Sequence, residues 1–215
     1  MSQSRFMTDG KPGHQAPPPE HSHEKKPEKA KKTGMDAYVL LALGLLLFMI
    51  GGHFNNAPLA GQHKLLVATP QMPMKELQKT VIFMAGHNKT QAYGIVINKP
   101  GVKGAPGYGG PLEKDKVYAL HSLDVRLPET QVLQDVEIGF VEGQAGVDKL
   151  KSAKTKPLWC IVVRGYTGWG AGQVEQEISA GNWEFVEFDR NAITSTPSVK
   201  LWDVAKKLPK FQLTH

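Results

Sequence analysis

Cysteine is almost absent from this 215-residue sequence, and Cys160 is the only one. One cysteine excludes an intramolecular disulfide and a multi-cysteine zinc site. Because Trp159 and Ile161 flank it, we expect a buried thiol with a raised pKa, not a nucleophile. The histidines His14, His21 and His23 lack partners in a fixed geometry, so the sequence predicts neither a bound metal nor another cofactor.

The share of hydrophobic residues, 40% of the chain, is slightly low for a globular protein, and the shortage lies at the start. Residues 1–34 are rich in proline, lysine and glutamate, and Phe6 is their only aromatic residue. This composition cannot bury enough apolar surface to offset the entropy of ordering, so we predict a disordered basic tail over 1–34.

The sequence has no dense basic stripe, although its net charge is +6. Residues 1–34 hold seven basic and four acidic residues, and the remainder holds 19 and 16. The excess charge is therefore shared between a short tail and a nearly balanced remainder, which argues against a nucleic-acid partner.

Residues 35–54 form the one long apolar stretch, in which Ala37 to Gly52 carry no charge. Those 16 residues would span roughly 24 Å as a helix, which predicts a short transmembrane helix. Five of the ten residues directly before it are lysines, and Lys64 is the first lysine or arginine after it. The positive-inside rule then predicts a single-pass protein of a bacterial inner membrane, with a cytoplasmic N-terminus and a periplasmic C-terminal domain. The alternative places the domain in the cytoplasm.

A cleaved signal peptide is the competing interpretation of this stretch. Cleavage after Ala60 would place Pro58 at the −3 position, which is unfavourable, and the preceding polar region is unusually long. An uncleaved anchor is favoured, followed by a linker over residues 55–63.

Residues 64–215 are long enough for one domain with its own core. Short β-branched and aromatic runs predict strands, and apolar spacing predicts helices. The expected strands are Leu65–Thr69, Thr80–Met84, Ala92–Asn98, Val117–His121, Leu158–Arg164 and Trp183–Phe188. The expected helices are Ala145–Ala153, a segment around Val174–Ile178 that ends at Gly181, and one around Leu201–Leu208 begun by Thr196 and Pro197. This order predicts an α+β fold with a curved, largely antiparallel sheet.

Several segments resemble one known family when taken together. They are Leu65–Pro73, Val81–Met84, His87-Asn88, Ala92–Pro100, Gly109–Pro111, Leu120-His121, Gly165–Ile178 with Trp183, and Leu201–Ala205. In order and spacing they resemble the AlgH/YqgE family of bacterial proteins, whose members are generally soluble and have no established reaction. The resemblance implies a sheet folded into a partial barrel, with a few helices, over residues 64–215.

The glycine-rich segment from Gly165 to Gly172 is expected to join a strand to a helix. Such a turn can cradle an anion with backbone N–H groups, but this one lacks the spacing of a P-loop or a dinucleotide fold. The simpler interpretation is a tight turn that makes room for Trp169. We predict a ligand or partner surface from this turn and the glycine loop before it. Its residues are Gly109, Gly110, Pro111, Gly165, Gly168, Trp169, Gly172 and Gln173.

His87, Asn88 and His121 are the weak catalytic candidates, since two histidines could form an acid–base pair if the fold joined them. A His-Asn turn is equally ordinary, because asparagine tolerates turn conformations. The leading hypothesis is therefore a membrane-anchored, non-catalytic binding or scaffold module with an unknown protein or small-ligand partner. The alternatives are a hydrolase-like enzyme using His87 and His121, and a cytoplasmic-side regulator.

Overall fold

The computed structural model describes residues 58–102 and 104–212. The predicted tail, the predicted membrane helix over 35–54 and the first part of the linker lie outside these residues. Within the part of the chain that is described, no helix is long and apolar enough to cross a membrane.

Nine strands form one sheet in the order β6-β7-β5-β8-β3-β2-β1-β9, with β4 paired to β8. The pairs are antiparallel except for β4 with β8, as expected for a largely antiparallel sheet. The strands are β1 Leu65–Ala68, β2 Val81–His87, β3 Gln91–Val96, β4 Gly107–Tyr108, β5 Leu112–His121, β6 Gln131–Leu133, β7 Ile138–Glu142, β8 Cys160–Gly170 and β9 Trp183–Val186. The helices are η1 Lys75–Leu77 (a 3-10 turn), α2 Gln144–Ser152, α3 Gln173–Ser179, α4 Arg190–Ser195 and α5 Ser198–Ala205.

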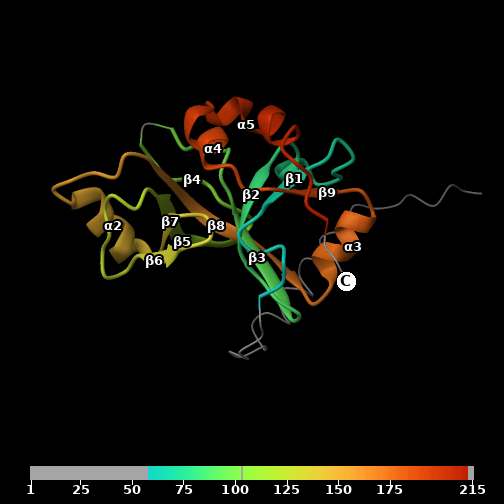
Figure 1. Cartoon of the computed structure of the whole chain (residues 1–215), viewed down its shortest axis with the longest axis horizontal. Coiled ribbons are helices and arrows are strands. Elements are labelled where there is room, and N and C mark those ends of the chain that lie inside the picture. Colours follow the sequence, from blue (N-terminus) through green and yellow to red (C-terminus); the bar gives the residue numbers. More distant parts are fainter. Residues whose placement is uncertain (1–57, 103, 213–215) are drawn as a thin grey trace, which may run out of the picture. The chain divides into compact units, whose positions relative to one another are not determined.

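The sheet curls into a half-barrel whose two halves meet on β8 (Figure 1). The first part of β8 pairs with β5 and β4, and its last residues pair with β3. Between these parts, Gly165 has a φ of +78°, a conformation that costs glycine little. We infer that β8 bends here from one half of the sheet to the other.

Side chains form three hydrophobic clusters around this curl. One cluster draws on both halves of the sheet and on α4 and α5, through Ile193, Leu201 and Ala205, so it fills the inside of the curl. On the outer surface, α3 covers one half through Val174, and α2 covers the other through Val147 and its neighbours. Alternating residues of β1 divide between the inner cluster and the α3 cluster, because successive side chains of a strand point to opposite faces.

All six expected strands and three expected helices are present, but several boundaries were wrong. β8 continues to Gly170, so most of the segment expected as a glycine-rich turn is strand. Thr196 ends α4 and does not begin α5, whose N-cap is Pro197. The sequence prediction missed β4, β6, β7, η1 and α4.

Candidate functional site

His87 lies at the end of β2, and a β-bulge decides which way it points. Met84 pairs with Gly94 but Gly86 pairs with Tyr93, so Ala85 is an extra residue on β2. An extra residue reverses the alternation of the side chains that follow it. His87 consequently faces the α3 side of the sheet, where its pairing partner Ala92 also packs.

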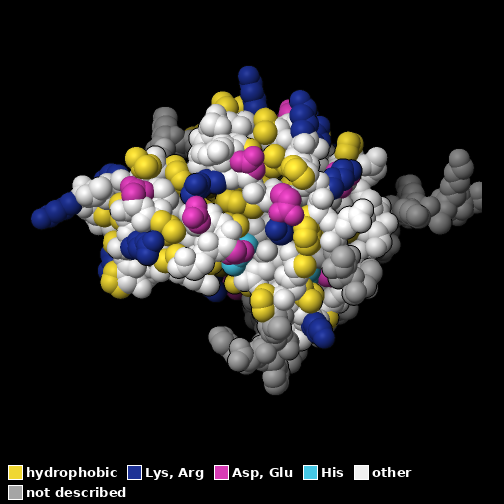
Figure 2. All heavy atoms as spheres, in the orientation of Figure 1, with side chains coloured by type: hydrophobic (Ala, Val, Ile, Leu, Met, Phe, Trp, Pro, Cys, Tyr) yellow, Lys and Arg dark blue, Asp and Glu magenta, His cyan; other side chains and the backbone are white. Residues whose placement is uncertain are grey.

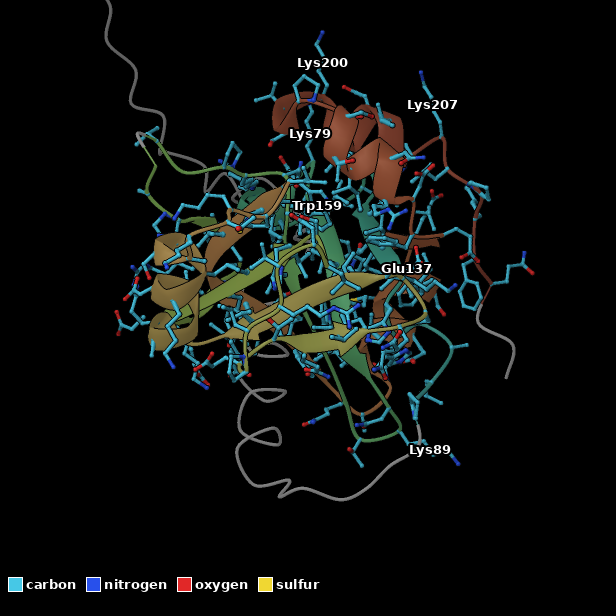
Figure 3. All side chains as sticks on the ribbon, turned by 60° about the vertical axis from the view of Figure 1, so that its left-hand side comes forward. Lys79, Lys89, Glu137, Trp159, Lys200 and Lys207 are labelled. Atoms are coloured by element: carbon cyan, nitrogen blue, oxygen red, sulfur yellow. The ribbon has the colours of Figure 1, made fainter. Side chains whose placement is uncertain are left out.

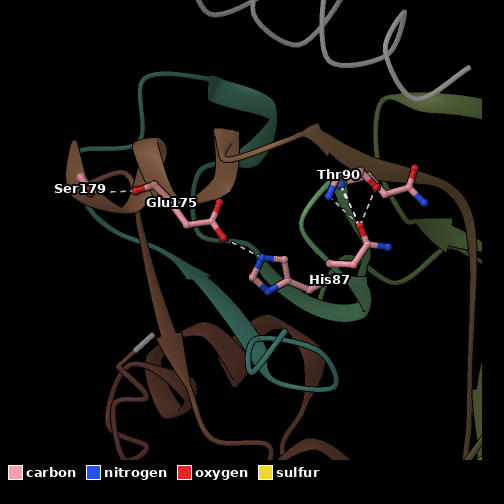
Figure 4. A network of polar contacts seen from close by, with 6 residues as sticks. His87, Thr90, Glu175 and Ser179 are labelled. Carbon is pink, nitrogen blue, oxygen red and sulfur yellow. Dashed lines mark hydrogen bonds and ion pairs between the residues drawn. The ribbon is translucent and has the colours of Figure 1, made fainter. Parts of the chain in front are cut away.

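The His87 ring is sealed between α3 and the segment that precedes β1. It is 2% exposed, and its Nε2 lies 2.7 Å from Oε1 of Glu175 (Figure 4). Its Nδ1 has no hydrogen-bond partner among the described residues and faces Gly61, where an added Cβ would lie 2.5 Å away. This arrangement fits an Nε2–H that donates to the Glu175 carboxylate, and Gly61 leaves no space for a substrate at Nδ1.

Asn88 forms the β2–β3 turn. Its Oδ1 accepts hydrogen bonds from the N–H and hydroxyl of Thr90, at 2.9 and 2.8 Å, and from the N–H of Gln91, at 3.0 Å (Figure 4). These bonds occupy the side-chain oxygen in stabilising the turn, which is the ordinary role of asparagine in such a position.

His121 ends β5 and is completely buried. Its Nδ1 lies 2.9 Å from the carbonyl oxygen of Ser122, and its Nε2 lies 3.3 Å from the hydroxyl of Thr130. Burial lowers the pKa of His121 below its ordinary value, against smaller opposing effects of the Ser122 carbonyl and Asp124. A neutral ring with both nitrogens engaged is a structural residue.

The structure does not bring His87 and His121 together. Through β3, His87 is in register with Trp169, at the end of β8, whereas His121 pairs with Cys160, at its beginning. Nine residues of strand measure roughly 30 Å along the chain, and the bend at Gly165 places the two ends of β8 in different halves of the sheet. The acid–base pair considered from the sequence is therefore not assembled.

The predicted glycine surface is mostly a close contact between two backbones. An added Cβ would lie 2.2 Å from the Gly165 oxygen at Gly109, 2.1 Å from the Tyr166 carbonyl carbon at Gly110, and 2.5 Å from the Gly110 oxygen at Gly165. The Gly109 N–H donates to the Arg164 carbonyl at 2.8 Å. These glycines let the segment before Pro111 pack against β8, so the packing interpretation explains them better than an anion cradle does.

Trp169 and Gln173 belong to a buried polar network around Glu177. The indoles of Trp169 and Trp183 donate to Oε2 of Glu177 at 3.1 and 2.7 Å, and the Gln173 amide donates to its Oε1 at 3.0 Å. Trp169 is 2% exposed and Gln173 is 7% exposed. Their side chains therefore do not form the predicted ligand surface.

The other two glycines of that surface have different roles. An added Cβ at Gly168 would lie 3.1 Å from the Leu112 side chain, whereas one at Gly172 would meet nothing within 4 Å. Gly172, with a φ of +69°, caps α3 at its N-terminus.

Cys160 corrects another expectation, because this residue is exposed at the start of β8 and not buried. Even so, desolvation of the thiolate raises the pKa of Cys160 to about 11, with Lys151 acting in the opposite direction. The thiol is protonated at neutral pH, in agreement with the prediction that it is not a nucleophile.

The sequence analysis missed His63, which makes a long-range polar contact. It has a φ of +59°, and its Nδ1 lies 2.7 and 2.8 Å from the two carboxylate oxygens of Asp135. Its ring stacks on Phe83 with a centroid distance of 6.0 Å. The two partners lie 72 residues apart, so nothing in the local sequence pattern could pair them. Within the described residues, no group of three or more His, Cys, Asp or Glu side chains could hold a metal ion.

Comparison with known proteins gives the family. The profile described as AlgH-like matches residues 65–213. The chain belongs to the AlgH-like family. A UPF0301 protein of Caulobacter vibrioides is 26% identical over 171 residues, covering 70% of this chain and 87% of its own. A UPF0301 protein of Bordetella petrii is 29% identical over 177 residues, covering 72% and 86%.

Two solved structures share the AlgH-like fold. The AlgH protein from Pseudomonas aeruginosa is 25% identical, with a TM-score of 0.57 over 72% of this chain and 92% of that one. A Corynebacterium diphtheriae protein is 22% identical, with the same TM-score over 73% and 91%. The resemblance found in the sequence is thus confirmed for the AlgH-like domain, whose function in this family is unknown.

The described surface of this AlgH-like domain has several hollows, and two of them combine aromatic and charged side chains. The first, which we call the α3–β9 hollow, measures about 740 Å³ and includes Ile178, Trp183, Phe185, Lys206, Lys210 and Phe211. The second, the Trp159 hollow, measures about 520 Å³ and includes Asp124, Arg126, Glu137, Leu158, Trp159 and Arg190. Both volumes lie within the usual range for ligand sites.

Proposed function

We propose that this AlgH-like protein is a membrane-anchored, non-catalytic binding module, and that its α3–β9 hollow takes an acidic segment of a partner protein that carries an apolar side chain. The hollow is the observation that carries this proposal. The hydrolase-like alternative has little geometric support, because His87 on β2 and His121 on β5 are in register with opposite ends of β8.

The lining of the α3–β9 hollow supports an apolar anchor. Trp183 and Phe185 form the buried floor, and Ile178 and Phe211 are partly buried beside it. The Phe211 ring meets Phe185 edge-on, with centroids 6.5 Å apart, so the hollow is walled by fixed aromatic surfaces. Rigid aromatic pockets of this kind take up the apolar anchors of protein partners.

Lysines at the rim of the hollow support an acidic ligand. Lys210 pairs with Glu184 at 2.7 Å, and Lys206 pairs with Asp203 at 3.3 Å. Exposed pairs of this kind contribute little, so a ligand carboxylate can replace the internal one at small cost. Elsewhere, Figure 2 shows basic and acidic side chains interspersed over the visible face, which does not resemble the continuous basic surface of a nucleic-acid-binding protein.

The membrane anchor rests on the sequence of residues 35–54, which lies outside the described residues. An anchor would hold the domain near one membrane face and raise the effective concentration of partners there. A modest affinity in the hollow would then be sufficient for a stable association.

Binding of short peptides to the full chain in nanodiscs of zwitterionic lipid tests the hollow. The probes are fluorescein-labelled peptides that alternate leucine or phenylalanine with glutamate, and the same peptides with lysine in place of glutamate. We expect saturable anisotropy changes with the glutamate peptide alone. Gln71→Trp, at the hollow, should weaken binding about tenfold, whereas Lys89→Trp, on the exposed β2–β3 turn, should not. Equal binding of both peptides, or equal effects of both variants, would contradict the proposal.

A further inference from the structure

The Trp159 hollow lies apart from the residues considered above and has an amphipathic lining. It is formed by the loop after β5, the residues before β8, the β6–β7 turn and the start of α4. Leu158 is 87% exposed there and Trp159 is half-buried, while Arg126 and Arg190 supply two cations. Trp159 and Glu137 are labelled in Figure 3, in which the left-hand side of Figure 1 is turned forward.

The apolar wall of this hollow is held in place by polar contacts beneath it. Carboxylate oxygens of Asp124 accept from the Leu158 N–H at 3.2 and 3.4 Å, and the Trp159 N–H donates to the Ser122 hydroxyl at 3.3 Å. Asp124 is therefore engaged in positioning Leu158 and Trp159. An exposed leucine fixed beside a tryptophan is a preformed apolar contact surface.

Glu137 is the unusual residue of the opposite wall. Its φ is +52°, a left-handed conformation that is unfavourable for any residue with a Cβ. Its carboxylate lies 3.1 Å from Nη1 of Arg190, yet the two side chains are 69% and 46% exposed. An ion pair so exposed contributes little stability, so another carboxylate can replace Glu137 at Arg190 at small cost. The φ of Glu137 belongs to the four-residue turn that joins β6 to β7, and this turn directs its side chain toward Arg190.

Arg126 completes the polar part of the hollow. Among residues 58–102 and 104–212 we find neither an ion pair nor a hydrogen bond for its guanidinium group. Arg190 is thus paired with the carboxylate of Glu137, whereas the Arg126 guanidinium is available to bind a ligand. Guanidinium groups bind carboxylates with defined geometry, so the pair suits a ligand with one carboxylate.

We propose that the Trp159 hollow binds a small amphipathic carboxylate. Arg190 and Arg126 contact the ligand's carboxylate, and Trp159 with Leu158 contacts its apolar group. In the unliganded protein the Glu137 carboxylate occupies Arg190 in place of the ligand. Glu137 is accordingly an internal competitor, and ligand binding releases it. The volume of about 520 Å³ suits a small molecule more than a protein segment.

The test uses the full chain labelled with 5-fluorotryptophan and observed by ¹⁹F NMR, with Trp159→Phe to assign the Trp159 resonance. The probe is 3-phenylpropionate, and its neutral analogue 3-phenylpropionamide is the control. We expect a saturable shift of the Trp159 resonance with the carboxylate only. Arg190→Gln should weaken binding about tenfold, because it removes the charged partner of the ligand.

Glu137→Gln decides whether Glu137 is a competitor. It should tighten binding of 3-phenylpropionate about threefold, because an exposed ion pair of ordinary strength no longer has to be broken. Glu142→Gln, which alters an exposed pair with Lys116 outside the hollow, is the matched control and should change nothing. Unchanged resonances of Trp169, Trp183 and Trp202 will show that each variant is folded.

The proposal is overturned if the amide binds as well as the carboxylate, if no saturable shift occurs, or if Glu137→Gln leaves the affinity unchanged. The Trp159 hollow shares no lining residue with the α3–β9 hollow. The outcome of the ¹⁹F NMR experiment is therefore independent of the outcome of the peptide-binding experiment.

Discussion

Glu177 shows at the scale of single residues how a carboxylate can organise apolar neighbours. It accepts hydrogen bonds from two indoles and one amide, on α3, β8 and the start of β9. Trp169 and Trp183 also meet edge-on, with centroids 6.1 Å apart. The network thus fixes α3 against the sheet through polar atoms inside an otherwise apolar cluster.

Replacing Glu177 with leucine should destabilise the domain by about 2–4 kcal/mol, because three partly or fully buried donors would lose their acceptor. Glu177→Gln should cost less, since its amide oxygen can still accept from both indoles. Urea unfolding of the full chain measures both, with Gln176→Leu on the exposed side of α3 as control. A loss below about 0.5 kcal/mol for Glu177→Leu would show that water satisfies these donors.

At the scale of secondary-structure elements, two glycines with similar φ values have different surroundings, so their replacement should affect stability differently. Gly165 and Gly172 have φ values of +78° and +69°. Only Gly165 is crowded, because the backbone oxygens of Gly110 and Leu112 lie against it. Gly172→Ala should therefore cost about 1 kcal/mol, for the left-handed conformation alone.

Gly165→Ala should cost about 3 kcal/mol or more, because a Cβ would lie 2.5 Å from the Gly110 oxygen. Thermal unfolding of the two variants side by side gives the comparison. Equal losses would mean that β8 can bend at Gly165 without this close backbone contact.

The same elements show what the sequence could and could not predict. Strands such as β1, β2 and β9 were recognisable because their apolar β-branched and aromatic runs reflect local burial. β6 has three residues and β4 has two, so neither had a readable period. The Gly165–Gly172 segment was misjudged because glycine in a strand marks close backbone approach as well as turns.

The surroundings of the predicted site residues also depend on contacts that the fold makes. Trp169 and Gln173 were proposed as surface residues, but their burial depends on Glu177 and Trp183, which the fold brings against them. The bulge on β2 sets the direction of His87, and the length of β8 sets its distance from His121. Neither property can be read from the spacing of the residues themselves.

At the scale of the whole molecule, the proposed anchor makes a prediction about sidedness. Protease added to intact spheroplasts should remove the C-terminal domain while an N-terminal tag survives in the membrane fraction, because the lysines before residue 35 keep the tail inside. Immunoblotting of tags at both ends provides the measurement. A domain protected until the cells are lysed would contradict this topology and favour the cytoplasmic-side regulator.

The position of β1 has a mechanical consequence. β1 follows directly on residues 58–64, and hydrogen bonds join it to β2 on one side and to β9 on the other. Bonds from Leu59 to His87 and from His63 to Met84 extend the attachment to β2. Since these bonds lie across the strand, tension applied through an anchor would load both rows in shear and would not peel them apart one at a time. A bound partner could thus pull on the domain while β1 stays hydrogen-bonded to β2 and β9.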